Sequence, residues 1–131
     1  MGLFGGSASR MTDRSIKLYD AGDYNGALLA ANKVIEKYPN YTGGYSARAQ
    51  VYRKQKEYDK AIADYTEAIK HPPEEFYSNH SYTIYCRGHA YLEKGDFDRA
   101  IADFTKALEL DTTKPSHIRN ALEKAQKMKH S

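Results

Sequence analysis

The sequence repeats itself along most of its length, and this repetition restricts the possible folds more than any other feature. Three eight-residue segments align, at 21–28, 55–62 and 94–101. The alanines that they share are Ala27, Ala61 and Ala100. Their spacing is 34 residues and then 39, so five residues are inserted before the third segment. A period of this length is typical of repeat proteins, in which neighbouring units bury each other's apolar faces.

Apolar and small residues follow each shared alanine at the same steps. After Ala61 they are Tyr65, Ala68 and Ile69, and the other two segments keep this pattern. Such steps place the side chains on one face of a helix. A second stripe lies upstream, at Tyr45, Ala49 and Tyr52 in one repeat and at Ile84, Gly88 and Tyr91 in the next. Each repeat is therefore predicted to be two amphipathic helices joined by a short turn.

Small residues have defined places in this pattern. Ala49 and Gly88 let a first helix approach its partner closely, and a larger side chain there is expected to cost about 1–3 kcal/mol through overpacking. Gly22 and Gly95 fall where a helix must stop and reverse, a place that favours left-handed backbone dihedral angles. The second repeat has Lys56 at this place. Its turn is therefore expected either to carry some strain or to take another form.

The third repeat carries the most detailed pattern. Its characteristic residues are Gly88, Tyr91, Gly95, Asp96, Phe97, Ala100, Phe104 and Ala107. Together with the period, they resemble the tetratricopeptide-repeat family, over residues 8–41, 42–75 and 81–114. The resemblance implies an all-α fold, a right-handed α-solenoid of three helix-turn-helix units whose first helices line a concave groove.

The ends of the chain lie outside the repeats. Residues 1–7 are expected to form a flexible leader. Residues 115–131 are expected to form a capping helix and a basic tail, because a stack of repeats leaves an apolar end that must be covered. The apolar stripe of this last helix comprises Ile118, Leu122, Ala125 and Met128.

The insertion occupies residues 76–80 and follows Pro72, Pro73 and two glutamates. Proline near a helix start and acidic residues in the first turn both favour a helix. We therefore expect the insertion to lengthen the first helix of the third repeat by about a turn. A loop is the alternative.

The resemblance implies a protein–protein interaction module, an adaptor or scaffold that binds a peptide or protein segment in the groove. By the family's repeat positions, the side chains placed toward the groove include Tyr19, Gln50, Arg53, Lys54, Tyr82, Tyr85 and His89. Tyrosine offers apolar area with a hydroxyl group and is favoured in binding hot spots. Arginine and lysine pair with acidic ligand groups. We hypothesise that these residues contact the ligand; the alternative is that the tyrosines only cover neighbouring helices.

One subgroup of the family binds the acidic C-terminal tails of cytosolic heat-shock chaperones through a carboxylate clamp of lysine, arginine and asparagine. At the five corresponding positions this sequence has Thr12, Ile16, Ala47, Tyr82 and Cys86. None of these side chains is cationic, and a terminal carboxylate is held poorly without cationic donors. A co-chaperone that binds chaperone tails is therefore disfavoured.

Self-association through repeat ends or the convex face is the main alternative, with the chain as a structural subunit or homo-oligomer. The family's fold hosts many partners, so the fold does not decide between these functions. Catalysis has little support, because Cys86 and His89 share a helix face without an orienting group or oxyanion donors. With His80 they also lack the spacing of zinc ligands. We expect no enzyme, no cofactor and no metal.

Composition limits the partners and the location. The net charge is only +3, with acids and bases interspersed, which does not indicate nucleic-acid binding. No apolar run is long enough to span a membrane. Gly2 only partly fits an N-myristoylation signal, because Gly6 stands at the favoured Ser/Thr position. The single cysteine, Cys86, cannot form an intrachain disulfide, so a cytoplasmic location is expected.

Overall fold

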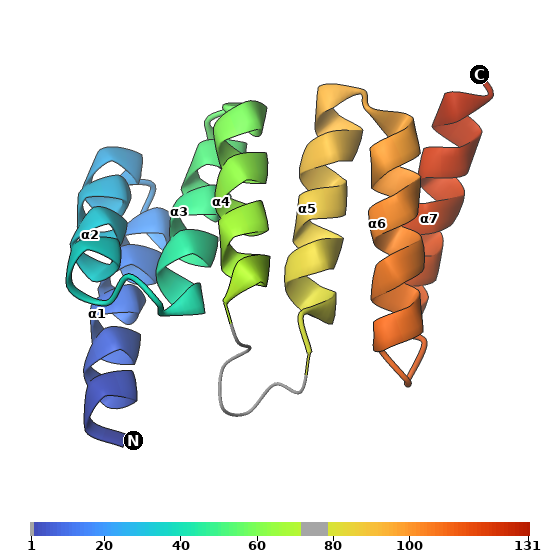
Figure 1. Ribbon diagram of the computed structural model, residues 1–131. Coiled ribbons are helices and arrows are strands. Elements are labelled where there is room, and N and C mark those ends of the chain that lie inside the picture. Colours follow the sequence, from blue (N-terminus) through green and yellow to red (C-terminus); the bar gives the residue numbers. More distant parts are fainter. Residues whose placement is uncertain (1, 72–78) are drawn as a thin grey trace. The chain divides into compact units, whose positions relative to one another are not determined.

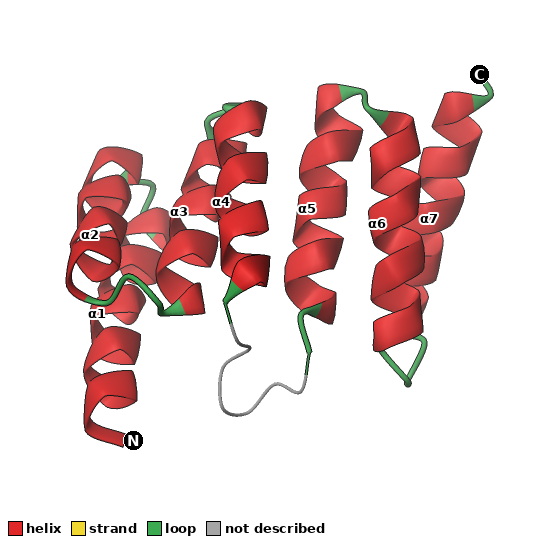
Figure 2. Cartoon of the chain, viewed as in Figure 1, coloured by secondary structure: helices red, strands yellow, loops and turns green. Residues whose placement is uncertain are grey.

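The computed structural model describes residues 2–71 and 79–131, and these residues form seven α-helices and no strand (Figures 1 and 2). The helices are α1 (Gly2–Asp20), α2 (Tyr24–Lys37), α3 (Thr42–Lys54), α4 (Tyr58–Lys70), α5 (Ser81–Lys94), α6 (Phe97–Leu110) and α7 (Ser116–Lys129). Short turns join α1 to α2, α3 to α4 and α5 to α6. The predicted all-α fold of helix-turn-helix pairs followed by one further helix is therefore confirmed.

The chain divides into two compact units, Met1–Glu74 and Glu75–Ser131. In the first unit, α1 packs against α2 and α3 packs against α4, while α3 also contacts α1 and α2. Helices α1 and α3 run in the same direction (Figure 1). In the second unit, α5 packs against α6, and α7 covers α6 and touches α5. Each unit thus has its own set of helix contacts.

The three turns inside the helix pairs close in the same way. An N–H beyond each first helix donates to a carbonyl oxygen five residues earlier. The pairs are Asp23 with Leu18, Glu57 with Tyr52, and Asp96 with Tyr91, at 2.9, 2.8 and 2.9 Å. The residue before each donor has a positive φ, 85° at Gly22, 63° at Lys56 and 95° at Gly95. The second turn therefore keeps the form of the other two and holds a lysine in the left-handed region, where a side chain is strained.

Alanine and glycine allow the paired helices to approach closely. The fully buried alanines include Ala27, Ala31, Ala49, Ala61, Ala68, Ala100 and Ala107. A Cβ atom added to Gly88 would lie only 2.7 Å from Phe104 Cε1, well inside the optimal carbon–carbon separation. The predicted close approach at Ala49 and Gly88 is therefore confirmed. Tyr65 and Phe104 are the largest fully buried side chains beside these small residues.

The start of the chain differs from the expected leader. Residues 1–7 were predicted to be flexible, but α1 begins at Gly2. Ala8 is 1% exposed and is the first residue of the core. Once packing has fixed this turn of helix, each further residue adds a hydrogen bond without a new nucleation step. The helix therefore continues to the N-terminal side of Ala8.

The insertion also differs from the expectation. The prediction of a lengthened first helix is wrong at Asn79 and His80, because α5 begins at Ser81. The Asn79 side chain accepts from Ser81 N at 3.0 Å and donates to the Leu110 carbonyl oxygen at 3.1 Å. Such side-chain hydrogen bonds compete with helix formation. Residues 76–78, the rest of the insertion, lie outside the described residues.

Candidate functional site

Three of the predicted binding residues, Tyr82, Tyr85 and His89, lie together on one face of α5. The ring centroids of Tyr82 and Tyr85 are 6.1 Å apart. Those of Tyr85 and His89 are 4.7 Å apart, in an edge-to-face arrangement. Tyr82 is 61% exposed, whereas Tyr85 and His89 are half-buried. The structure therefore brings these three rings into one row that ends in an exposed tyrosine.

Rings from two further helices hold Tyr85 in place. The ring centroid of Phe104 in α6 lies 5.8 Å from that of Tyr85, and that of His117 in α7 lies 5.1 Å away. His89 and the fully buried Phe104 are 5.2 Å apart. These separations fall within the range of about 4.5–7 Å in which aromatic rings attract each other. We call Tyr82, Tyr85, His89, Phe104 and His117 the aromatic cluster.

His117 is a member of this cluster that was not predicted. Positions within the repeats indicated the other groove residues, but α7 follows the third repeat and has no counterpart in the first two. The position of His117, one residue before the buried Ile118, marks it only as part of the first turn of that helix. Its contact with Tyr85 arises from the packing of α7.

The other four predicted residues lie in the first unit, near the C-terminal ends of two neighbouring helices. Gln50, Arg53 and Lys54 belong to the end of α3, and Tyr19 lies next to the last residue of α1. Lys54 is exposed, and Gln50 and Arg53 are half-buried. Cations at the end of a helix are favoured by its dipole. Tyr19 packs against Tyr24 of α2, with ring centroids 5.7 Å apart, so part of its ring covers a neighbouring helix.

The five positions of the chaperone-tail clamp hold no cation. Thr12, Ala47 and Cys86 are buried, at 7%, 8% and 4% exposure. Ile16 and Tyr82 are exposed. The two exposed side chains therefore present apolar and aromatic surface, and none of the five positions has the cationic donor that would hold a carboxylate.

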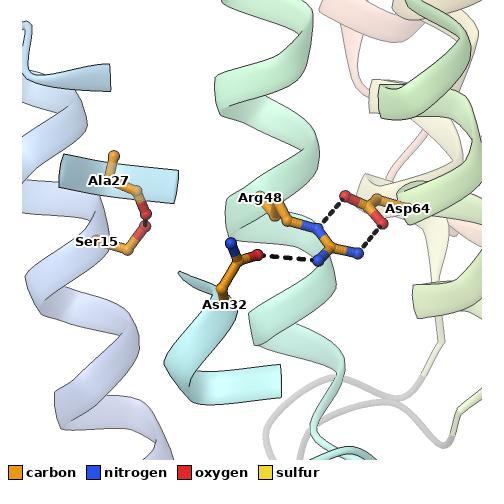
Figure 3. A network of polar contacts seen from close by, with 5 residues as sticks. All are labelled: Ser15, Ala27, Asn32, Arg48 and Asp64. Carbon is orange, nitrogen blue, oxygen red and sulfur yellow. Dashed lines mark hydrogen bonds and ion pairs between the residues drawn. The ribbon is translucent and has the colours of Figure 1, made fainter. Parts of the chain in front are cut away.

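Two arginine–aspartate pairs were not predicted. One joins the two helices of the second repeat, and the other joins the two helices of the third repeat. Arg48 donates to both carboxylate oxygens of Asp64 at 2.7 Å, and Arg87 donates to both oxygens of Asp103 at 2.9 Å. Arg48 also donates to Asn32 Oδ1 of α2 at 3.0 Å (Figure 3). Hydrogen bonding to the carboxylates raises the pKa of both arginines above the ordinary value, although burial opposes this shift.

A signal for these pairs was present in the sequence. Each arginine precedes its aspartate by sixteen residues, and both members recur 39 residues later. This signal is easily overlooked, because these residues lie between the apolar stripe positions, where polar side chains are ordinarily solvated.

Comparison with known proteins agrees with the repeat pattern. Residues 14–41, 44–73 and 81–113 each match the tetratricopeptide repeat, so that more than half of the chain is matched. The chain belongs to the tetratricopeptide-repeat family. None of the described helices of this tetratricopeptide-repeat protein combines the length and the apolar character needed to cross a membrane.

Several known proteins are similar to this tetratricopeptide-repeat chain. It is 46% identical over 46 residues to the Hsp70-Hsp90 organizing protein 3 of Arabidopsis thaliana, a match that covers 35% of this chain and 8% of that protein. The structure of the first TPR of Spaghetti (RPAP3) bound to the HSP90 peptide SRMEEVD has a TM-score of 0.81 at 23% identity, covering 95% of this chain and 94% of that one. The second TPR domain of human RPAP3, in complex with the HSP70 peptide SGPTIEEVD, gives 0.76 at 25% identity, covering 91% and 94%.

Proposed function

We propose that this chain is a protein-interaction module whose aromatic cluster binds a peptide or protein segment of a partner. The observation that carries the proposal is the exposed ring of Tyr82, 61% exposed, at the end of a packed row of rings on α5. A tyrosine in this setting offers a large apolar area and a hydroxyl group to a ligand. Such residues are enriched among those that dominate binding energy.

The packing behind Tyr82 supports this role. Tyr85 contacts rings on α5, α6 and α7, so its side chain is already ordered before a ligand arrives. Ordering a side chain on binding costs about 0.5–1.5 kcal/mol, and an ordered platform avoids much of that cost. A ligand that covers Tyr82 would therefore rest on a surface that is rigid beneath it.

The predicted residues of the first unit are also proposed to bind a partner. Arg53 and Lys54 at the end of α3 provide positive charge for acidic groups of the partner, and Gln50 provides an amide. Tyr19 adds apolar area at the end of α1. We propose that this group of the first unit contacts an acidic segment of a partner.

The ligand is proposed to differ from a chaperone tail, although two structural neighbours have HSP90 or HSP70 peptides bound. Thr12, Ile16, Ala47, Tyr82 and Cys86 provide no cation for a terminal carboxylate. Isothermal titration with the peptide SRMEEVD tests this point directly. We expect no saturable heat; micromolar binding would overturn this part of the proposal.

Site-specific crosslinking tests the binding surface itself. Benzoylphenylalanine replaces Tyr82 in one preparation and the exposed Thr105 of α6 in a matched control, and both are irradiated in cell extract. We expect a partner that crosslinks from position 82 but not from position 105. An excess of the natural chain should suppress this product, whereas a Tyr82→Ala competitor should not. Equal crosslinking from both positions, or equal competition by both chains, contradicts the proposal. A crosslink between two copies of the chain favours self-association instead.

A further inference from the structure

The first repeat lacks the carboxylate that the other two repeats place against their arginine. The 34-residue spacing makes Arg14 the counterpart of Arg48, and Ala30 the counterpart of Asp64. The first repeat therefore has the arginine, but it has an alanine in place of the aspartate. In the described part of the chain, the side chain of Arg14 forms no ion pair, and it is exposed.

A pocket of about 340 Å³ lies between α1 and α2 at this place. Its apolar walls are Met11, Leu18, Leu29 and Ala30, and its cations are Arg14 and Lys33. Leu29 is 64% exposed, whereas Ile16 and Met128 are 40% and 39% exposed. A pocket of this size lies at the lower end of the range of binding pockets, which is about 300–1,000 Å³.

The charge of the pocket favours an anionic ligand group. The lining has two cations, Arg14 and Lys33, and one carboxylate, that of Asp23. This carboxylate accepts from Gly26 N at 2.9 Å as the N-cap of α2, so it is already used by the helix end. Lys33 also forms no ion pair in the described part of the chain. A carboxylate close to an apolar side chain would complement both features.

The second repeat indicates what kind of segment fits this face. There, α2 packs against α3, and Asn32 of α2 reaches the paired Arg48 at 3.0 Å (Figure 3). A helix therefore covers the face of α3 that corresponds to the Arg14 face of α1. The exposed Leu29 beside this face matches the apolar side of such a helix.

We propose that the open face of the first repeat docks an acidic amphipathic helix of a partner protein. A glutamate or aspartate of that helix binds Arg14 as Asp64 binds Arg48, and an apolar side chain one turn away lies on Leu29. The terminal helix of a second copy is a poor occupant, because its exposed residues include Arg119, Lys124 and Lys127. This surface uses none of the residues proposed for peptide binding, so the two proposals fail independently.

A designed peptide tests this docking site. The probe is an end-blocked sixteen-residue helix of alanine, glutamine and leucine, with two glutamates flanking its leucine stripe. A matched peptide carries glutamine in place of both glutamates. Titration into the ¹⁵N-labelled chain should shift the amide resonances of Arg14, Leu29 and Ala30, with at least tenfold weaker binding of the glutamine peptide.

The decisive variant is Ala30→Asp, which supplies the internal carboxylate that the other two repeats have. We expect this variant to fold as the natural chain does and to lose at least tenfold in affinity for the glutamate peptide. Exposed Leu29→Ser should weaken binding without a change in circular dichroism, and Lys106→Ser on α6 is its control. Equal affinity of Ala30→Asp and the natural chain, resonance shifts outside α1 and α2, or no saturable binding at millimolar peptide would overturn the proposal. A concentration-dependent dimer that Leu29→Ser abolishes would overturn it in favour of a second copy.

Discussion

In the turn between its two helices, the second repeat has a lysine with a left-handed backbone angle, where the other two repeats have glycine. Gly22 and Gly95 adopt positive φ without strain, because glycine has no Cβ atom. Lys56 adopts a φ of 63° in a turn closed by the same backbone hydrogen bond. The closing bond and the packing of α3 against α4 therefore hold this residue in a conformation that its own side chain disfavours.

Replacing Lys56 with glycine should stabilise the protein. The strain of a non-glycine residue in the left-handed region is about 1–2 kcal/mol, and the greater freedom of glycine in the unfolded chain offsets part of this gain. We expect Lys56→Gly to raise the free energy of unfolding by about 1 kcal/mol, measured as a higher urea midpoint at an unchanged slope. Gly95→Ala is the converse control and should lower the midpoint. A decrease with Lys56→Gly would show that the turn is unstrained.

Asp96 should make the stability depend on pH. Its side chain accepts from Arg99 Nη1 at 2.7 Å and from Arg99 N at 3.3 Å, as the N-cap of α6. These hydrogen bonds, the side-chain bond first, lower the pKa of Asp96 below its ordinary value of 3.8. A lowered pKa in the folded state means that the stabilisation is complete above the unfolded pKa and is lost as the pH falls through the folded one.

Asp96→Asn separates this charge effect from capping, because asparagine also caps helices. The natural chain should be more stable than this variant at pH 7, and the difference should shrink as the pH falls below about 4. Urea unfolding of both chains between pH 7 and pH 2.5 provides the measurement. A difference that stays constant over this range would assign the role of Asp96 to its hydrogen bonds alone.

At the scale of helices, the pair α5 and α6 depends on the absence of a side chain at Gly88. A Cβ atom there would meet Phe104 Cε1 at 2.7 Å and Asp103 Cβ at 3.2 Å. Phe104 is fully buried, and Asp103 is held by Arg87. Neither neighbour has room to move away, so the added methyl group must separate the helices.

Gly88→Ala should therefore destabilise the protein by about 1–3 kcal/mol through overpacking. Gly6→Ala is the matched control, because a Cβ atom there has no neighbour closer than 4.0 Å. In an open helix position the same exchange should stabilise the helix by about 0.5–1 kcal/mol. Thermal unfolding of the two variants beside the natural chain should give shifts of opposite sign. A stabilising effect of Gly88→Ala would show that α5 and α6 pack less closely than described.

For the whole molecule, the repeat period of the sequence predicts the helices, the turns between them and their close packing. Seven helices in the described residues, the three turns and the close packing at Ala49 and Gly88 follow from spacing and residue size. The end of the insertion was predicted wrongly. The hydrogen bond of Asn79 to Ser81 is local, but the one to Leu110 links residues that only the folded chain brings together.

The candidate site was predictable only in part, for a related reason. Tyr82, Tyr85 and His89 share a helix, so their spacing alone places them in one row. His117 comes from a helix outside the repeats, and its contact with Tyr85 depends on how α7 packs. That Arg14 forms no ion pair with the described residues becomes significant only when the pairs of Arg48 and Arg87 are known.

The final helix, α7, covers the last repeat and should determine whether the whole molecule stays monomeric. Helix α7 packs against α6 and buries Ile118, Ala121 and Ala125, while its lysines face solvent. A repeat stack needs such a cap, because the last repeat otherwise exposes its apolar face. A chain that ends at Thr113 should therefore be less stable and should self-associate, and light scattering after size-exclusion chromatography would detect the larger mass. The control Lys124→Gln/Lys127→Gln keeps the apolar stripe and should have the mass of the natural chain. If the control self-associates as the shortened chain does, charge repulsion, and not the apolar cover, prevents association.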